Sequence, residues 1–333
     1  MPWLQDLNSH PLDHLVVFAE ENHRYTYTPT GERVRKSMTA VLKPIFDTFD
    51  AVKVAQKHVP TWLKMDGGAV PENAHRYHHM CRARQLVEGE DEAAIVQYMA
   101  KYWEANGLEA AAEGTRVHRD LELYVQGELP PPSTDEPPPE CVAGYIGWRD
   151  WFYPQLELEP WRVEFSMVLT TTVQTDAGAV EIPVVSGQID MIMRSKKTGK
   201  YILVDWKNTN AAKKGKIGQK KLAPGKRAYP DAKAQAPFEA FDANDFSKYS
   251  AQLLGYKFML ESGGYFEPGE IVGCYIVQVH RDLDRFHVIE AAEGLDEDSF
   301  RDCVHAMMQG EIELAREEYL AKHPLASVPE SGA

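Results

Sequence analysis

The sequence of 333 residues predicts an α/β fold in which helices flank a mixed β-sheet. Three observations lead to this prediction. Helical periodicity dominates before residue 125, strand-like segments joined by short turns lie between residues 163 and 207, and a helix and further strands follow residue 246. A chain with a helix, three strands, a helix and a strand in this order is typical of an α/β sandwich around a mixed sheet.

The N-terminal third is expected to be mainly helical. A short extended segment covers residues 24–28, and helical periodicity then runs over 37–65, where Val41, Ile45, Phe49 and Val52 recur at spacings of three or four. Further helices are expected over residues 74–88, 91–106 and 113–125. Gly107 is predicted to end the second of these helices.

The middle of the chain is expected to form the sheet. Five aromatic residues crowd a short stretch and predict a helix packed on the core: Trp148, Trp151, Phe152, Tyr153 and Trp161. Strands are then expected over residues 163–174, 180–194 and 200–207, the first two joined by a tight turn at 176–178. After them we expect a helix over 246–261, strands over 271–279 and 285–290, and an amphipathic helix over 296–321.

These elements suggest three regions. Residues 1–110 are expected to form a helical N-terminal cap or arch, residues 111–295 the core, and residues 296–333 a C-terminal helix and tail. Residues 130–140, rich in proline and acids, break the regular structure. The core carries a polar insertion over residues 208–245, and a loop of this length is usually functional or disordered.

The charge of the chain is unevenly distributed. The net charge is −14, which by itself argues against binding to a polyanion. Residues 194–233, however, contain thirteen Lys or Arg and two Asp, a local balance of +11. A basic segment in an acidic protein indicates a localised anion-binding surface, although a solvated loop is the alternative.

Patterns for targeting or for clusters are missing from the sequence. No run of about 18 apolar residues occurs, so we expect no membrane span, and residues 1–21 do not resemble a signal peptide. Cys81, Cys141, Cys274 and Cys303 lie far apart and form no CxxC pair. We therefore expect reduced thiols in an intracellular protein, with neither a zinc knuckle nor an iron–sulfur cluster.

Two neighbouring strands carry charged residues in a pattern that indicates chemistry. Side chains alternate along a strand, so Asp205 and Lys207 share one face while Trp206 and its apolar neighbours take the other. On the preceding strand, Asp190 interrupts an apolar set. Two carboxylates suit Mg²⁺ or Mn²⁺, and a nearby ammonium suits phosphodiester hydrolysis. Taken alone, the same triplet also fits a simple Asp–Lys ion pair at a strand end.

Four ordered motifs extend this pattern. They are Gly114-Thr-Arg-Val-His118 with Glu122, Gly187-Gln-Ile-Asp190, Asp205-Trp-Lys207, and Gln252 with Tyr256 four residues later. Together they resemble the RecB-like branch of the PD-(D/E)xK nucleases over residues 114–280. Ser37-Met-Thr39 and the Asp-Trp-Lys triplet are most similar to exonucleases of the mitochondrial genome maintenance family and their viral relatives.

The resemblance implies a restriction-endonuclease-like fold and a role for each matching residue. His118, Asp190, Asp205 and the backbone carbonyl of Trp206 would hold Mg²⁺ or Mn²⁺, and Lys207 would act on the attacking water. Glu122, one helical turn after His118, would share its face, and Glu164 would stand behind the metal ligands as a further acid. Gln252 and Tyr256 would steady the site or a substrate phosphate.

The resemblance also implies a function. The expected activity is hydrolysis of DNA by an exonuclease that handles single-stranded or free ends, with DNA replication, repair or recombination proteins as partners. Five lysines of the insertion would contact the DNA backbone: Lys213, Lys214, Lys216, Lys220 and Lys221. A structure-specific endonuclease, a ring-shaped phage-type exonuclease and a module that binds nucleic acid without cutting it remain as alternatives.

Overall fold

The computed structural model describes residues 4–46, 50–63, 91–127, 146–147, 149–150, 154–155, 157–209, 233–280 and 286–324. The chain divides into two compact units. One unit joins Met1–Asp47 with Val117–Ala333, and the other is Thr48–Arg116. The division therefore does not follow the expected boundary at residue 110.

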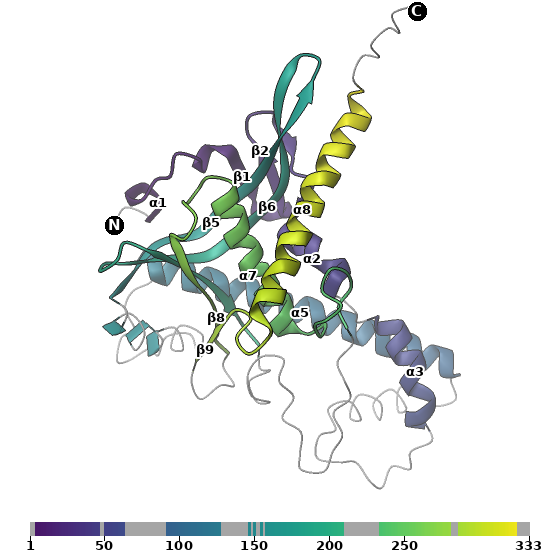
Figure 1. Cartoon of the computed structure of the whole chain (residues 1–333). Helices are drawn as coiled ribbons and strands as arrows, with labels where there is room; N and C mark the ends of the chain where they lie inside the picture. Colours follow the sequence, from purple (N-terminus) through teal and green to yellow (C-terminus); the bar gives the residue numbers. More distant parts are fainter. Residues whose placement is uncertain are drawn as a thin grey trace, which may run out of the picture. The chain divides into compact units, whose positions relative to one another are not determined.

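A six-stranded mixed sheet forms the centre of the larger unit (Figure 1). Its strands are β4 (Lys36–Ser37), β5 (Leu158–Thr175), β6 (Gly178–Ser195), β7 (Tyr201–Lys207), β8 (Ile271–Gln278) and β9 (His287–Glu290). The strand order is β4-β6-β7-β8-β9, and β5 pairs with β6. The pairs β4–β6 and β7–β8 are parallel and the others are antiparallel, which confirms the mixed α/β sheet flanked by helices.

Helices cover the sheet with two separate clusters of buried side chains. The first cluster packs α2 (Met38–Phe46), α7 (Asp245–Ser262) and α8 (Glu297–Lys322) against the sheet (Figure 1). The second cluster packs Val117 and Leu121, from the C-terminal part of α5 (Glu92–Gln126), against side chains of β5 to β8. The sheet is therefore buried through both clusters, which explains why β6 and β7 contain so few exposed residues.

The first 47 residues belong to this unit and do not form a separate cap. Strand β4 adds to the edge of β6, and the apolar face of α2 lies in the first cluster with Met38 and Leu42 fully buried. Helix α8 contributes Phe300 and Met308 to the same cluster. Both ends of the chain thus complete the core, because burial of their apolar faces needs the sheet.

A second, three-stranded sheet precedes β4. It consists of β1 (Val16–Ala19), β2 (Arg24–Tyr27) and β3 (Glu32–Arg33), all antiparallel. Val16 and Tyr27 are buried together with Val168 of β5, so this small sheet packs along β5. The short helix α1 (Leu4–Leu7) and two 3-10 turns, Asp13–Leu15 and Glu20–Asn22, complete the segment.

The smaller unit contains α3 (Ala51–Leu63) and the N-terminal part of α5. Its core is a separate cluster that includes Ala55, Val59 and Met99. The helix expected over residues 74–88 lies outside the described residues. In the described part of the chain, no helix is long and apolar enough to cross a membrane.

Two predictions about local structure were wrong. Gly107 does not end a helix, because α5 continues through it to Gln126 and stops at Gly127, whose φ of 75° is left-handed. A glycine inside a helix costs only about 1 kcal/mol, so good helix formers on both sides outweigh it. Trp161 lies in β5 and not in a helix. Its ring packs edge-on against that of Tyr201, with the ring centroids 5.2 Å apart.

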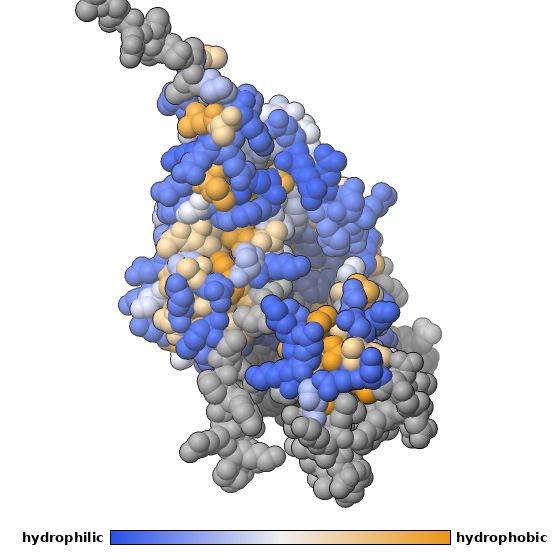
Figure 2. Space-filling model, turned by 90° about the vertical axis from the view of Figure 1, so that its right-hand side faces the viewer, coloured by the Kyte–Doolittle hydropathy of each residue, from blue (hydrophilic) through white to orange (hydrophobic). Residues whose placement is uncertain are grey.

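The surface in Figure 2 is largely hydrophilic, with apolar side chains in separate patches. Large apolar side chains that remain exposed among the described residues are Leu7, Val17, Leu108, Val272 and Leu314. Singly exposed apolar residues are normal on a globular surface.

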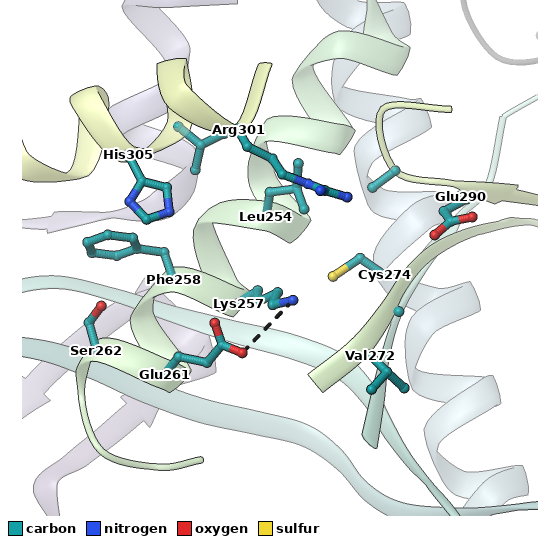
Figure 3. A pocket seen from close by; sticks show the side chains of 13 residues that line it. Leu254, Lys257, Phe258, Glu261, Ser262, Val272, Cys274, Glu290, Arg301 and His305 are labelled. Carbon is teal, nitrogen blue, oxygen red and sulfur yellow. Dashed lines mark ion pairs between the residues drawn. The ribbon is translucent and has the colours of Figure 1, made fainter. Parts of the chain in front are cut away.

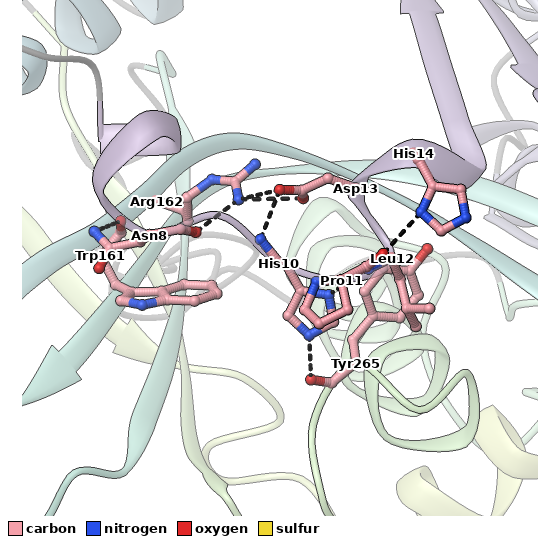
Figure 4. Close-up of polar contacts among 9 residues, drawn as sticks. All are labelled: Asn8, His10, Pro11, Leu12, Asp13, His14, Trp161, Arg162 and Tyr265. Carbon is pink, nitrogen blue, oxygen red and sulfur yellow. Dashed lines mark hydrogen bonds and ion pairs between the residues drawn. The ribbon is translucent and has the colours of Figure 1, made fainter.

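A buried ion pair anchors the N-terminal segment to β5 (Figure 4). The Arg162 side chain is 4% exposed, and its Nη1 lies 2.9 Å from Asp13 Oδ2 and donates to the Asn8 carbonyl at 3.0 Å. Asn8 Nδ2 donates to the Trp161 carbonyl at 2.8 Å. The guanidinium is therefore neutralised by a segment that lies about 150 residues away in sequence.

Replacing Asp13 with Ala should destabilise the fold by about 3 kcal/mol, because Arg162 would keep its buried charge without a partner. Urea unfolding measures the loss. Glu297→Ala is the matched control, since it removes an exposed helical ion pair with Arg301 and should cost less than about 1 kcal/mol. Equal losses in the two variants would contradict the anchoring role of the Asp13–Arg162 pair.

Candidate active site

The candidate site lies where β6 and β7 separate. The two strands pair from Arg194 and Tyr201 only as far as Met191 and Val204. Beyond this point β6 pairs with β4 and β5, while β7 continues along β8. Asp190 and Asp205 are the next residues on each strand, so the fork brings the two carboxylates of the sequence motifs together.

Asp190 closes the fork through a hydrogen bond. Its Oδ2 accepts the backbone N–H of Trp206 at 2.6 Å, in place of a strand-to-strand bond. Its Oδ1 lies 3.4 Å from Nδ1 of His118, which α5 supplies. Burial raises the pKa of Asp190, but His118 and the N–H of Trp206 outweigh burial and the pKa is lowered. Asp190 is therefore ionised and held by both neighbours.

Asp205 and Lys207 form the second charged pair. Lys207 Nζ lies 2.5 Å from Asp205 Oδ2, and these side chains are 16% and 2% exposed. Burial, reinforced by Asp190, raises the pKa of Asp205 to about 6 although Lys207 opposes the shift. Burial lowers the pKa of Lys207, but Asp205 and Asp190 outweigh it and the pKa rises. The ammonium also lies 4.6 Å from the ring centroid of Tyr249, a cation–π contact that stabilises its charge.

Glu164 of β5 adds a third acid to the fork. The ladder pairs on either side of it, Val163 with Met191 and Phe165 with Ile189, leave Glu164 opposite Asp190. Its φ is 48°, a left-handed backbone that is uncommon for a residue with a side chain. Such conformations persist where surrounding packing imposes them, often at functional sites.

Burial and acidic neighbours both act on the Glu164 carboxyl. Burial raises its pKa well above the usual value, and the charges of Asp190 and Glu122 raise it further. Glu122 itself pairs with Arg119, one turn before it on α5, at 2.6 Å. The structure therefore places Glu122 beside the acid group as a source of negative potential, and it brings Glu164 closer to the site than the sequence motifs indicated.

The acids and the imidazole form a group that fits a divalent cation. One ligand atom each from His118, Glu164 and Asp190 lie within 4.8 Å of one another. Asp205 Oδ2 is buried, with the Lys207 ammonium as its close neighbour. Buried acids that lie this close together, two of them with a raised pKa, are what a hard cation would stabilise. Asp190 raises the pKa of His118, whose imidazole must be neutral to bind a metal.

Helix α7 supplies the remaining two motif residues. Gln252 Nε2 donates to Tyr256 Oη at 3.0 Å, and the Tyr256 side chain is buried. The Tyr256 ring packs directly against Gly187 of β6, where an added Cβ would lie 2.4 Å from Cε1 of the ring. The glycine of the Gly187-Gln-Ile-Asp190 motif is thus required by the tyrosine of the last motif, and the pair sets the spacing between α7 and β6.

Not every expected site residue can be placed. Trp206 enters the site through its N–H, and its buried side chain lies in the second core cluster. The role expected of its carbonyl stays a prediction. Five lysines lie outside the described residues: Lys213, Lys214, Lys216, Lys220 and Lys221.

The sequence motifs missed Tyr25. This residue of β2 lies close enough to the acids that Glu164 and Asp190, after burial, raise its pKa. Tyr25 also contributes to the raised pKa of Tyr256, although burial is the larger cause. No motif or periodicity signals this role, because Tyr25 reaches the site only through packing of the small sheet along β5.

A separate cavity of about 300 Å³ lies between α7, β8 and α8 (Figure 3). Leu254, Phe258 and Val304 line its apolar part, and Lys257 and Arg301 are among its charged residues. It includes none of the fork residues, so the candidate chemistry and this cavity are distinct features.

Gly187→Ala should destabilise the protein by about 1–3 kcal/mol, because the new methyl group must displace the buried Tyr256 ring or bend β6. Thermal unfolding measures the change. Gly310→Ala in α8 is the control, since its Cβ would meet no atom within 4 Å and alanine favours a helix by up to about 1 kcal/mol. If Gly187→Ala is as stable as wild type, the tyrosine does not need this glycine.

Comparison with known proteins adds little to this geometry. No model of a protein family matches the chain, and no curated protein matches it. Fourteen chains of solved structures match, among them the crystal structure of SSO0001, with 12% identity over 81% of this chain and 88% of that chain and a TM-score of 0.24. A TM-score this low bears on neither fold nor function.

Proposed function

We propose that this chain is a Mg²⁺- or Mn²⁺-dependent deoxyribonuclease of the RecB-like PD-(D/E)xK type, acting as an exonuclease on single-stranded DNA ends. The observation that carries the proposal is the fork between β6 and β7. There Asp190, Asp205 and Lys207 come together, and His118 lies beside Asp190.

The arrangement of the sheet supports a restriction-endonuclease-like core. Three antiparallel strands, β5, β6 and β7, follow one another, and α7 then leads to β8, which lies parallel to β7. In this arrangement the charged residues of β6 and β7 gather at the point where the two strands part. That point is where the proposed chemistry takes place.

Each site residue has a role that its surroundings support. Asp190, Asp205, His118 and Glu164 would hold the cation, with the Trp206 carbonyl as a further ligand. A bound Mg²⁺ or Mn²⁺ supplies an activated water and stabilises charge on the phosphoryl oxygens. Lys207 stays charged beside Asp205, so its ammonium can orient the attacking water or neutralise developing charge.

Gln252 and Tyr256 lie on the neighbouring helix and are already hydrogen-bonded to each other. In the proposal, Tyr256 steadies the strand that carries Asp190 through its contact with Gly187, and the pair borders the place of the substrate phosphate. In the proposal, Glu122 pairs with Arg119 and contributes negative potential near Glu164.

The proposed partner is DNA with a free single-stranded end, met together with proteins of replication, repair or recombination. The insertion lysines, Lys213 to Lys221, would follow the backbone, in keeping with the +11 balance of residues 194–233. An iron–sulfur cluster forms no part of the proposal. Cys274 and Cys303, the cysteines among the described residues, are free thiols, and Cys274 is buried.

Asp205→Asn should lower cleavage of end-labelled single-stranded DNA at least about 100-fold, because a carboxylate of the site is lost. It should not lower stability at pH 7. The folded-state pKa of Asp205 is about 6, above its usual value of 3.8, so ionising it weakens the fold as pH rises from about 4 to 6. Asparagine avoids this ionisation. Cleavage assays and thermal melts at pH 4 and pH 7 measure the two effects.

Asp242→Asn is the matched control. Asp242 is half-buried, pairs with Lys233 at 2.8 Å and is not among the residues that could hold the cation, so this variant should cleave within about twofold of wild type. Unchanged turnover in Asp205→Asn would show that the fork is not the site of cleavage. A wild type that binds DNA without cutting it would point to a binding module, and cleavage of closed single-stranded circles would point to an endonuclease.

His118→Ala should weaken Mn²⁺ binding about tenfold or more, because the imidazole would no longer complete the metal shell. Raised Mn²⁺ should then restore part of the cleavage rate, since Mn²⁺ accepts nitrogen ligands more readily than Mg²⁺ does. Calorimetric titration with MnCl₂ measures the affinity. His305→Ala, a histidine of α8 next to Phe258, is the control and should bind Mn²⁺ as wild type does. Equal affinity in His118→Ala and wild type would exclude the histidine as a ligand.

A further inference from the structure

The hairpin of β1 and β2 carries an aromatic pair beside the acid group. Phe18 and Tyr25 are direct cross-strand partners, with ring centroids 4.6 Å apart and planes at 33°. His23, at the turn of the hairpin, adds a third ring 5.7 Å from Phe18. Phe18 and Tyr25 are half-buried and His23 is exposed, so the group presents aromatic surface to solvent.

The position of this pair follows from the packing of the hairpin. Side chains two residues apart on a strand share a face, so Val16 and Tyr27 lie on the same face as Phe18 and Tyr25. Val16 and Tyr27 are buried against Val168 of β5. The inner face of the hairpin thus runs from the buried Val16 and Tyr27 to the half-buried Phe18 and Tyr25.

Nearby acids and the packing of the hairpin indicate where Phe18 and Tyr25 lie. Glu164 and Asp190 act on Tyr25, and Glu20, at the turn of the same hairpin, acts on Glu164. The hairpin also packs on Val168, which lies four residues after Glu164 on β5, and this packing places Tyr25 near the acids of the fork.

Tyr25 differs from the other tyrosines of this region in its hydroxyl. Tyr27 Oη donates to Glu181, Tyr256 Oη accepts from Gln252, and Tyr265 Oη accepts from the backbone of β5. Within the described residues, the Tyr25 hydroxyl has no hydrogen-bond partner. The hydroxyl is therefore not what holds Tyr25 in place; its ring packs against Phe18 and against the buried cluster of Val16, Tyr27, Val34 and Val168.

We propose that Phe18 and Tyr25 form a stacking platform for one unpaired nucleobase next to the bond that is cut. This inference rests on the proposed nuclease function and deepens it. Glu164 and Asp190 lie on the side of Tyr25, so the pair disfavours a backbone phosphate but accepts the neutral, flat face of a base. A base must leave its own stack to reach it, which selects single-stranded ends, and an aromatic platform accepts any base.

The test measures binding of oligothymidylates by fluorescence anisotropy in the Asp205→Asn background with Mg²⁺, so that the DNA is not cut. One substrate is intact, and a set of others each carries one abasic nucleotide near an end. Phe18→Leu should bind the intact strand roughly five- to a hundredfold more weakly, the range for one lost base stack. For one of the abasic strands, the parent with Phe18 intact should lose about the same factor in affinity. Phe18→Leu should bind that strand no more weakly than it binds the intact strand.

Two further variants separate stacking from structure. Phe18→Trp keeps an aromatic face and should retain both the affinity and the abasic effect, even if Phe18→Leu folds poorly. Val17→Ala, on the exposed outer face of the same strand, should bind as the parent does. Thermal melts of all variants accompany the titrations.

The outcomes distinguish the inference from the function on which it rests. If the wild type cuts DNA but Phe18→Leu binds intact and abasic strands as its parent does, the platform is overturned and the nuclease proposal stands. If an abasic nucleotide lowers the affinity of Phe18→Leu as much as it lowers that of the parent, the two losses are independent. That result overturns the platform as well. If the wild type neither binds nor cuts any strand, both proposals fall.

Discussion

The hydrogen bond from the Trp206 backbone N–H to Asp190 Oδ2 is the interaction on which the rest of the site depends. Where two strands part, a backbone N–H loses its partner in the ladder, and a buried N–H without a partner is costly. The Asp190 carboxylate satisfies it at 2.6 Å and so spans the fork between β6 and β7. The same contact holds Asp190 next to Asp205, because Trp206 follows Asp205 directly along β7.

The electrostatics of the fork follow from this concentration of acids in the core. Asp190 is kept ionised by its partners, whereas burial and its negative neighbours raise the pKa of Asp205 to about 6 and that of Glu164 well above normal. Lys207 alone cannot neutralise the group. Ionising these acids weakens the folded state at neutral pH, which is the cost expected of the cation site that we propose.

Elements from distant parts of the chain hold this group in place. Helix α5 presents His118 through its packing in the second core cluster, and α7 presses Tyr256 onto Gly187 from the first cluster. The small N-terminal sheet brings Tyr25 to the edge of the acids along β5. Because each element is fixed by its own buried apolar face, the charged residues need supply little of the stability themselves.

Local patterns in the sequence determined five of the six strands of the central sheet to within about five residues but not β4, and strand alternation by itself grouped Asp205 with Lys207 on one face. These features are local, since side-chain period and turn residues depend on neighbours in the chain. Only the tertiary structure decided that α5 continues past Gly107, that the first 47 residues complete the sheet unit, and that Glu164 lies within ligand distance of His118 and Asp190. Those outcomes depend on which apolar faces bury one another across the chain, and no local pattern records that choice.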